Sequence, residues 1–447
     1  MKFDELRLKY DSIIYHSFLI EEIENNMKIT FDFEIPSLCS FHPTLTLSKE
    51  MITNKNIDAE VLNNLVFHIG MIELISYYKC VCPKKVVIEA GYLDEDAKTW
   101  FKKLFYNGLG EFLYRNNITI SEDELFTFEI NGPKYEMNSN YNGKGNLIPI
   151  GGGKDSTVTL EILKNCDNKC FMINPKQVHY DCVSEYASND ICSVKRTIDK
   201  ELIRLNSEGF LNGHTPFSAI VAFISYLVAY LTERKYIVLS NENSANEPTV
   251  LNTNINHQYS KSYEFEKDFD DYVNNYFNLD IHYFSLLRPI KEIQIAYLFS
   301  KYSKYHKIFK SCNVGSKENP WIWCANCPKC LFVYIMLVAF LSDEEVIDIF
   351  NSNMLDNKSL ENTFLELIGV KETKPFECVG TIEEVKFALN MYIKKHNDLP
   401  YLVELYKDKY YEDINIDLNY LETINHNVPS EYYELLKEAI KSGNGNN

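Results

Sequence analysis

Three consecutive glycines followed by Lys, Asp and Ser form the segment GGGKDS, residues 151–156, directly after the apolar run LIPI. Glycines let backbone N–H groups converge on an anion, and the positive end of a following helix dipole adds to the attraction. Lys154 adds a charge, while Asp155 and Ser156 stand where a helix cap or a magnesium contact would lie. The segment predicts a phosphate-binding loop, with a glycine-rich structural turn as the alternative.

The type of phosphate loop follows from the patterns that this segment fails to match. A Walker A loop needs G-x-x-x-x-G-K-[ST], but Ile148 occupies the first glycine position and Asp155 the Ser/Thr position. The dinucleotide pattern G-x-G-x-x-G is also absent. The segment resembles the S-G-G-x-D-S pyrophosphate loop of the N-type ATP pyrophosphatases, with Gly151 in place of the first serine. That resemblance implies cleavage of ATP between the α and β phosphates, with transfer of AMP to a substrate oxygen. It also implies a set of ATP-phosphate ligands, with Asp155 near magnesium: Gly151, Gly152, Gly153, Lys154, Asp155 and Ser156.

Four cysteines lie close together in the sequence. Cys324, Cys327 and Cys330 are spaced C-x2-C-x2-C in WCANCPKC, and Cys312 ends the strand-like stretch HKIFKSC (306–312). Four thiolates in this arrangement can close a tetrahedral structural zinc site, and an iron–sulfur cluster is the alternative. Such a zinc site would add roughly 10 kcal/mol or more of folding energy. Synthases of the 7-cyano-deazaguanine base carry a similar four-cysteine site after a similar pyrophosphate loop.

Two polar segments between these motifs predict a ligand-binding crevice. YIVLS (236–240) has the character of a strand, and Ser240, Asn241 and Glu242 stand at its carboxyl end, where open α/β sheets bind ligands. Glu242 is suited to hold magnesium or a substrate ammonium. The segment NHQYSKSYEFE (256–266) concentrates polar and charged residues, and a solvated loop with a helix start is the alternative interpretation.

The ordered set of motifs resembles one family. The motifs are IPIGGGKDSTVTLE, LNGHTPFSAIVAFI, SNENSA, NHQYSKSYEFE, YFSLLRPI, WCANCPKCLFV and KPFECVG. The family is that of the UDP-N-acetylmuramoyl-L-alanyl-L-glutamate epimerases of bacterial peptidoglycan synthesis, and the resemblance is clearest over residues 145–385. It implies that the chain uses ATP and magnesium to invert the terminal L-glutamate of a UDP-muramoyl dipeptide. The products would be the D-glutamate dipeptide, AMP and pyrophosphate.

The chemistry of inversion explains why an epimerase would contain an adenylating loop. Inverting an α-carbon requires removal of its proton, and a free carboxylate resists this because the carbanion would add charge beside existing charge. Joining the carboxylate to AMP removes that charge and turns the carbonyl into an electron sink. A modest base can then take the proton, and hydrolysis of the acyl-adenylate releases the product acid. No pyridoxal lysine is needed.

A base that moves the α-proton must both reach the α-carbon and have a suitable pKa, and the sequence offers four candidates. We favour His257, while Lys261 is suited either to this role or to pairing with phosphate or carboxylate. Cys378 resembles the thiols of other glutamate racemases, but it lacks an evident partner and is interpreted as a buried structural cysteine. His214, in LNGHTP, is also a candidate for this role, but we expect it to cap or orient a loop instead of transferring the proton.

Two other functions fit parts of the pattern. A 7-cyano-7-deazaguanine synthase-like enzyme, which amidates a small carboxylate or forms a nitrile, would share the loop and the four-cysteine site but would require ammonia or an amine. A sensor or nucleic-acid-associated module would bind ATP without turnover. The acidic composition counts against the nucleic-acid role, and the polar segments over 240–266 count against a bare sensor.

Composition limits the possible locations and partners. The 447-residue chain has a formal net charge of −18 and no long Lys/Arg run, so we expect no nucleic-acid partner. Its start, MKFDELRLKYDS, lacks the apolar stretch of a signal peptide. The apolar runs 217–231 and 331–341 are shorter than the roughly 18 residues of a membrane span, so we expect buried helices and no membrane partner. These features and the 12 cysteines predict a cytoplasmic protein.

The order of the expected elements predicts the architecture. From residue 147, strand-like and helix-like stretches alternate, with a helix expected over 184–205, which is typical of a parallel sheet covered by helices. Together with the loop resemblance, this predicts an α/β fold of the PP-loop type (adenine nucleotide alpha-hydrolase-like), a doubly wound parallel sheet. We expect an N-terminal α+β domain over 1–145, an ATP-binding catalytic domain with the four-cysteine site over 146–345, a helical region over 346–440 and a disordered tail over 441–447.

Overall fold

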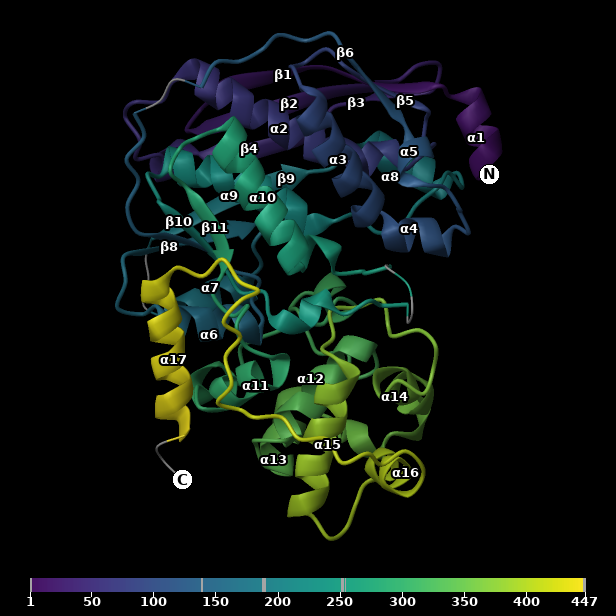
Figure 1. Cartoon of the computed structure of the whole chain (residues 1–447), viewed down its shortest axis with the longest axis vertical. Coiled ribbons are helices and arrows are strands. Elements are labelled where there is room, and N and C mark those ends of the chain that lie inside the picture. Colours follow the sequence, from purple (N-terminus) through teal and green to yellow (C-terminus); the bar gives the residue numbers. More distant parts are fainter. Residues whose placement is uncertain (1, 138–139, 187–189, 251–252, 254, 445–447) are drawn as a thin grey trace.

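The computed structural model describes residues 2–137, 140–186, 190–250, 253 and 255–444. These residues form an 11-stranded mixed sheet with helices around it and a mostly helical C-terminal region, shown in green to yellow in Figure 1. The coarse prediction, an α/β fold with a parallel-rich sheet and a helical C-terminal part, is confirmed. The strands are β1 (Ser12–Ile23), β2 (Asn26–Ile35), β3 (Cys39–Phe41), β4 (Thr44–Ser48), β5 (Lys85–Ile88), β6 (Thr127–Ile130), β7 (Asn146–Pro149), β8 (Asn168–Ile173), β9 (Ile191–Thr197), β10 (Tyr236–Leu239) and β11 (His282–Ser285).

The strand order places the two predicted ligand segments side by side. The parallel part of the sheet runs β11-β10-β7-β8-β9, so the chain extends the sheet from β7 in one direction through β8 and β9 and in the other through β10 and β11. The order therefore reverses between β7 and β10. In open α/β sheets a crevice forms at such a switch point, outside the carboxyl ends of the strands. Residues 151–156 follow β7 and residues 240–242 follow β10, so both begin at this crevice.

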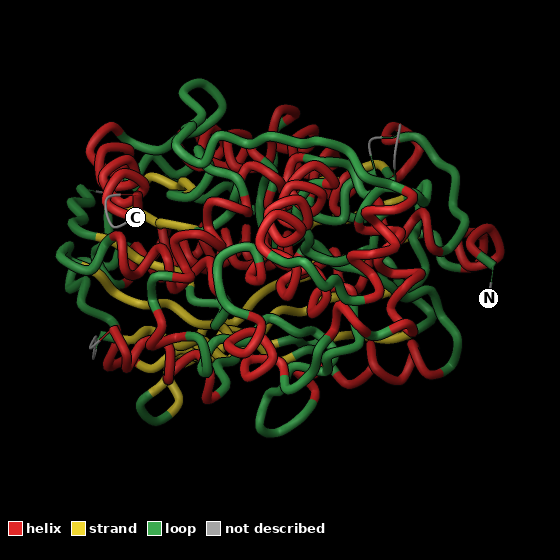
Figure 2. Tube along the Cα trace, turned by 90° about the horizontal axis from the view of Figure 1, so that it is seen from below, coloured by secondary structure: helices red, strands yellow, loops and turns green. Residues whose placement is uncertain are grey.

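The N-terminal strands continue the same sheet. β4 pairs antiparallel with β9, and β2, β1, β5 and β6 follow in that order, while β3 pairs with β2. The strands can be followed across most of the width of the molecule in Figure 2. Because strands before and after residue 145 share one sheet, the N-terminal segment is held directly against the ATP-binding part that the sequence predicts.

Two layers of helices cover the parallel strands. Side chains of β7 alternate between two cores: Leu147 belongs to the core that includes α2 and α9, and Ile148 to the core that includes α6, α11 and α12. The helices are α1 (Phe3–Lys9), α2 (Ala59–Tyr78), α3 (Glu95–Gly108), α4 (Gly110–Arg115), α5 (Glu122–Leu125), α6 (Lys154–Ile162), α7 (Gln177–Tyr186), α8 (Lys200–Ser207), α9 (Phe217–Leu231), α10 (Tyr263–Tyr276), α11 (Glu292–Ser300), α12 (Pro328–Val338), α13 (Asp343–Phe350), α14 (Glu361–Leu367), α15 (Ile382–Lys395), α16 (Tyr401–Lys409) and α17 (Ser430–Asn444).

Several element predictions can be compared directly with the structure. The buried helix predicted over 217–231 is α9, and the run 331–341 falls largely in the buried helix α12. The helix predicted over 184–205 is wrong, because its middle is β9, which pairs with β8 on one side and β4 on the other. Cys192 and Val194 alternate there with less buried residues, the two-residue period of a strand. The strand-like stretch 306–312 contains no strand.

The C-terminal segment returns to the parallel sheet. Helix α17 packs on α6 and α11, and the Tyr432 hydroxyl donates to the Asn146 Oδ1 atom at 2.5 Å, next to the start of β7. The predicted tail over 441–447 begins inside α17, which ends at Asn444, and residues 445–447 lie outside the described part. Among the described residues, no helix combines the length and apolar character that crossing a bilayer requires.

Candidate active site

A cavity of about 380 Å³ occupies the crevice at the carboxyl ends of β7 and β10. Phe171, Phe217 and Leu239 are among the apolar side chains of its wall, and polar and charged side chains are interspersed with them. Apolar walls with a few placed polar groups are typical of small-molecule sites. The predicted site residues that line it are Gly151, Gly153, Asp155, Ser156, Ser240, Asn241, Lys261 and Cys378.

The glycine loop presents its backbone to this cavity. Gly152 has φ +74°, a left-handed conformation that favours glycine, and a Cβ atom added there would lie 3.2 Å from Val178 Cγ1. A Cβ added to Gly151 would meet no atom within 4 Å. The loop therefore leaves open space beside its backbone, and the serine that the pyrophosphatase pattern has at position 151 would fit.

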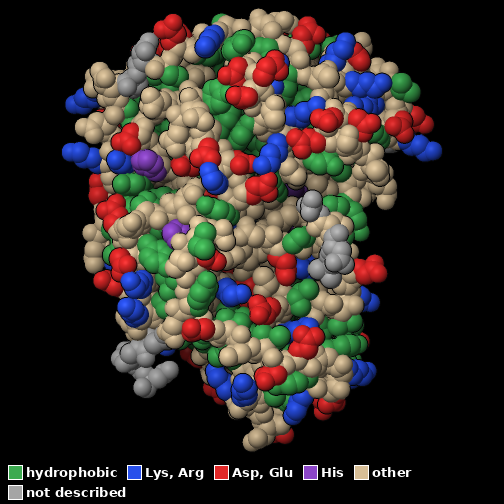
Figure 3. Space-filling model, viewed as in Figure 1, with side chains coloured by type: hydrophobic (Ala, Val, Ile, Leu, Met, Phe, Trp, Pro, Cys, Tyr) green, Lys and Arg blue, Asp and Glu red, His purple; other side chains and the backbone are tan. Residues whose placement is uncertain are grey.

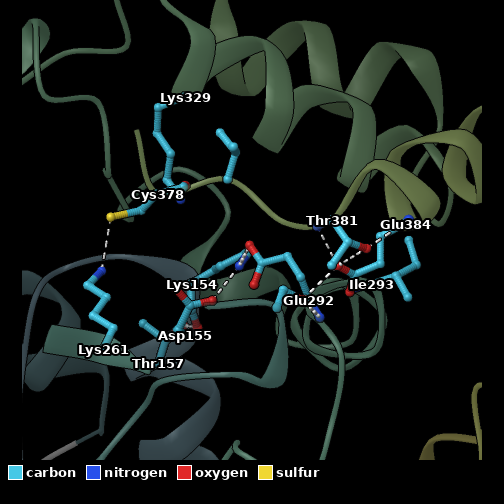
Figure 4. A network of polar contacts seen from close by, with 12 residues as sticks. Lys154, Asp155, Thr157, Lys261, Glu292, Ile293, Lys329, Cys378, Thr381 and Glu384 are labelled. Carbon is cyan, nitrogen blue, oxygen red and sulfur yellow. Dashed lines mark hydrogen bonds and ion pairs between the residues drawn. The ribbon is translucent and has the colours of Figure 1, made fainter. Parts of the chain in front are cut away.

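Lys154 does not point into the cavity. Its buried ammonium is ion-paired with Asp155 and lies 2.6 Å from Glu292 Oε1, at the start of α11 (Figure 4). Burial alone would lower the pKa of Lys154, but these two carboxylates outweigh it and raise the pKa above its usual range. Burial raises the pKa of Glu292, and the neighbouring Lys154 cation opposes this shift. In this arrangement Lys154 fastens the glycine loop to α11, and its predicted contact with phosphate stays a prediction.

Other residues near the loop have mainly positioning contacts. Ser240 Oγ lies 2.8 Å from Thr159 Oγ1, and the Asn241 amide donates to Ser285 Oγ at 3.2 Å. Glu242 is buried outside the cavity wall, and burial and the nearby Asp155 raise its pKa. Arg288 is fully buried and pairs with Glu266 at 2.9 Å, so its charge is neutralised within the protein.

The proton-transfer candidates form one connected cluster. The Lys261 Nζ atom lies 3.1 Å from the Cys378 Sγ atom, and both groups face the cavity (Figure 4). His257 interacts electrostatically with Cys378, and its Nδ1 atom is hydrogen-bonded to Glu111 Oε2 at 2.5 Å. The His214 Nδ1 atom lies 3.4 Å from the same Glu111 oxygen. The two histidines stand behind Cys378 and are not part of the cavity wall.

The charges within this cluster favour a thiolate at Cys378 and a protonated imidazole at His257. Burial would raise the pKa of Cys378, but Lys261 and then His257 and Lys329 lower it to about 6. Burial would lower the pKa of His257, but its interactions with Cys378 and Glu111 raise it to about 9. Burial and the neighbouring His257 lower the pKa of His214 to about 4, so His214 is neutral near pH 7. Cys378 thus has two partners, Lys261 and His257, although none was evident from the sequence.

Three residues of this site were not predicted from the sequence: Glu111, Glu292 and Lys329. Glu111 is contributed by α4 of the N-terminal segment, 146 residues before His257 in the chain. Glu292 stands in no motif. Only one feature of the sequence could have indicated Lys329, namely its position between Cys327 and Cys330 in WCANCPKC.

The four predicted cysteines come together around one point. Their sulfur atoms lie within 4.8 Å of one another, with Cys312–Cys327 and Cys324–Cys330 separations of 3.7 Å and a Cys327–Cys330 separation of 3.4 Å. A tetrahedral zinc ion with Zn–S bonds of about 2.3 Å would have sulfur atoms about 3.8 Å apart. The Gly315 N–H also donates to Cys312 Sγ at 3.1 Å, which favours a thiolate. The donor set and its spacing therefore fit a structural zinc site.

The cysteine cluster is joined to the cavity through α12. Cys327 caps this helix, Pro328 occupies its first turn, and Lys329 follows before Cys330. The Lys329 ammonium lines the cavity and donates to the Cys378 backbone carbonyl. A metal at the four cysteines would therefore hold both Lys329 and the backbone of Cys378 in place.

The MurL N-terminal domain model matches residues 5–286, and the MurL C-terminal domain model matches residues 308–409. The chain belongs to the MurL family. The predicted family is thereby confirmed, and the match extends through the N-terminal segment, where the motif resemblance was weaker.

Curated MurL relatives agree with this assignment. The UDP-N-acetyl-alpha-D-muramoyl-L-alanyl-L-glutamate epimerase of Xanthomonas oryzae pv. oryzae is 32% identical over 323 residues, which are 70% of this chain and 71% of that protein. Proteins of the same name from Micromonospora sp. and Salinispora tropica are 35% and 34% identical, and the aligned parts cover 71% of this chain and 72% and 70% of those proteins. No solved structure matches the chain. As a MurL protein the chain is an enzyme of the isomerase class, an epimerase.

Proposed function

We propose that this enzyme inverts the terminal L-glutamate of UDP-N-acetylmuramoyl-L-Ala-L-Glu to D-glutamate for peptidoglycan synthesis. In this proposal the glutamate carboxylate is joined to AMP from ATP, the α-carbon is inverted and the acyl-adenylate is hydrolysed, with release of pyrophosphate and AMP. One observation carries the proposal: the glycine loop and the Cys378–Lys261 pair line the same cavity. A carboxylate activated at the loop would have its α-carbon near groups that can move a proton.

The strand order supports a PP-loop type of ATP site. The loop over 151–156 leaves β7 at the switch point of the sheet and starts α6, so its N–H groups and the helix dipole serve the same place. The open space beside Gly151 leaves room for phosphate oxygens. Lys261 and Lys329 supply positive charge on the cavity wall, and its apolar side is suited to a purine base.

Two metals belong to the proposal. Zinc would be held by Cys312, Cys324, Cys327 and Cys330, and its role would be to fix the start of α12. Magnesium would accompany the ATP phosphates, with Asp155 as the carboxylate that faces the cavity. The pKa of Asp155 is lowered, mainly because Lys154 and Lys329 outweigh its burial, so its carboxylate is ionised. When bound, magnesium would neutralise phosphate charge.

The surface is consistent with a small-molecule substrate. On the face drawn in Figure 3, acidic and basic side chains are interspersed over both halves of the molecule, with no continuous basic stripe of the kind that follows a nucleic-acid backbone. Inside the cavity, Asp155, Lys261 and Lys329 bring charges of both signs together.

Pyrophosphate release separates the proposed reaction from its alternatives. The enzyme is incubated with ATP and magnesium, with and without the UDP-muramoyl dipeptide and with and without ammonia. Release that depends on the dipeptide and not on ammonia supports the epimerase. A requirement for ammonia would favour the amidating synthase, and no release under any condition would favour an ATP sensor.

A further inference from the structure

We propose that Cys378 and Lys261 form the acid–base pair that inverts the α-carbon. Glu111 and His257, which do not line the cavity, position this pair and favour its charged state. The inference rests on the proposed function and assigns its proton-transfer step. It replaces His257, the residue that the sequence favoured, with two groups that contact the substrate space directly.

Access to the cavity separates catalytic from positioning residues. Cys378 and Lys261 line the cavity with the glycine loop, whereas His257 and Glu111 do not. A base must be within hydrogen-bond reach of the proton that it takes. His257 Nδ1 is also held by Glu111 Oε2, and the imidazole ring acts on Cys378 electrostatically.

Glu111, His257 and Cys378 interact in that order, as a relay. Glu111 is buried and holds His257 Nδ1 with one oxygen, while its other oxygen accepts from Arg115 Nε at 2.5 Å. A carboxylate fixed in this way favours a protonated imidazole, and that imidazolium favours a thiolate at Cys378. The parallel with a nucleophile, a histidine and an orienting carboxylate is one of geometry and roles. Here the thiolate would accept a proton instead of attacking a carbonyl.

Three cations around Cys378 act on its thiol in the same direction. Lys261 reaches it from the short helix at Tyr259–Lys261, His257 from the loop before that helix, and Lys329 from α12, where it donates to the Cys378 carbonyl. These three cations hold the pKa of the thiol near 6, so the group is a thiolate at neutral pH. The thiolate in turn raises the pKa of Lys261, which therefore remains an ammonium. The cavity thus contains one group ready to accept a proton and one ready to donate it.

The proton balance of an inversion closes within this pair. The thiolate accepts the α-proton from one face, an S–H bond forms, and the C–H electron pair moves into the activated carbonyl. The bound α-carbon would lie between the two groups and separate their 3.1 Å contact, so that the Lys261 ammonium donates a proton to the opposite face, restores a C–H bond and becomes a neutral amine. After the product leaves, the thiol proton passes to that amine across the 3.1 Å contact, and both groups return to their starting charges.

The decisive variant is Cys378→Ser, which keeps the size of the side chain but removes the acidic thiol. We expect dipeptide-dependent pyrophosphate release within about threefold of the native rate, and loss of both D-glutamate and solvent deuterium at the α-carbon by at least a thousandfold. Cys166→Ser, at a half-buried cysteine outside the cavity, is the matched control and should retain both activities. Retained inversion in Cys378→Ser would overturn the assignment. Loss of pyrophosphate release as well would also overturn it, because Cys378 would then serve adenylation.

A second measurement uses the native chain and does not depend on the folding of a variant. Iodoacetamide labelling of Cys378, followed across pH by peptide mass spectrometry, should reach half its maximal rate near pH 6, and Lys261→Met should move this midpoint upward by about one pH unit or more. A native midpoint near that of an ordinary thiol would overturn the ion pair. Native enzyme that releases no pyrophosphate with the dipeptide would overturn the proposed function itself, and this assignment with it.

Discussion

The Nζ atom of Lys154 lies 2.6 Å from Oε1 of Glu292, and both side chains are almost completely buried. This ion pair connects the residue that follows the three glycines with the first turn of α11. It explains how a loop made of flexible residues is held in one conformation at the edge of the cavity.

Breaking this pair should destabilise the protein. Lys154→Met leaves the carboxylates of Asp155 and Glu292 without their shared cation, and removal of one partner from a buried ion pair costs about 3–5 kcal/mol. Urea unfolding followed by circular dichroism should show this loss. Lys267→Met, which removes an exposed partner of Asp271, is the matched control and should leave the midpoint unchanged. Equal midpoints for the two variants would contradict the role of Lys154 as a fastener.

The two glycines at the start of the loop should differ in their tolerance of a side chain. Gly152→Ala places a Cβ on a residue with φ +74° and close to Val178, at a cost of roughly 1–2 kcal/mol for the backbone alone, and should raise the KM for ATP. Gly151→Ser meets no neighbour and adds a hydroxyl donor beside the cavity, so stability should be unchanged and the KM for ATP unchanged or lower. The opposite ranking in steady-state kinetics would show that the loop backbone does not bind phosphate as proposed.

Metal removal should affect the active cavity as well as the fold. Elemental analysis should find one zinc ion per chain, and Cys330→Ser should lose it. Because Lys329 lies between two of the ligands and bonds to the Cys378 carbonyl, partial loss of zinc should reduce deuterium incorporation in proportion. Cys166→Ser again provides the control. Iron with acid-labile sulfide at this site would contradict the zinc assignment and favour a cluster.

The pH dependence of inversion should report the thiolate. Cys378 has a folded pKa lowered to about 6, so the reactive thiolate is present above that pH and is lost as pH falls through it. In Glu111→Gln, His257 loses the carboxylate that helps to raise its pKa to about 9, and it becomes neutral at lower pH. Cys378 then has one cation fewer, so the rising limb of kcat/KM should move to higher pH. An unchanged limb in Glu111→Gln would remove Glu111 and His257 from the relay.

Local patterns along the chain predicted much of this site. The glycines after β7 and the polar residues after β10 were each expected at a strand end, and a parallel sheet brings such ends together. The four cysteines were predicted from a spacing that metal sites need. These features are encoded within short segments, so they can be recognised without knowledge of the fold.

The cluster around Cys378 could not be predicted in the same way. Its thiol is activated by Lys261, 117 residues earlier in the chain, and by His257, whose own partner Glu111 belongs to the N-terminal segment. None of these residue types is unusual where it stands in the sequence. The contacts among these residues depend on long-range packing. Long-range packing also explains why β9 is a strand where a helix was expected, because β8 and β4 pair with it on either side.

The central claim is an ATP-driven inversion of glutamate, and chiral analysis in deuterium oxide tests it most directly. The enzyme is incubated with ATP, magnesium and UDP-N-acetylmuramoyl-L-Ala-L-Glu, and the product is then hydrolysed. Its glutamate enantiomers are separated, and their masses are measured by mass spectrometry. We expect D-glutamate with one α-deuterium and one AMP formed for each inversion, in a reaction that needs no ammonia. D-glutamate formed without ATP, or AMP formed while the glutamate stays entirely L and undeuterated, would contradict the claim.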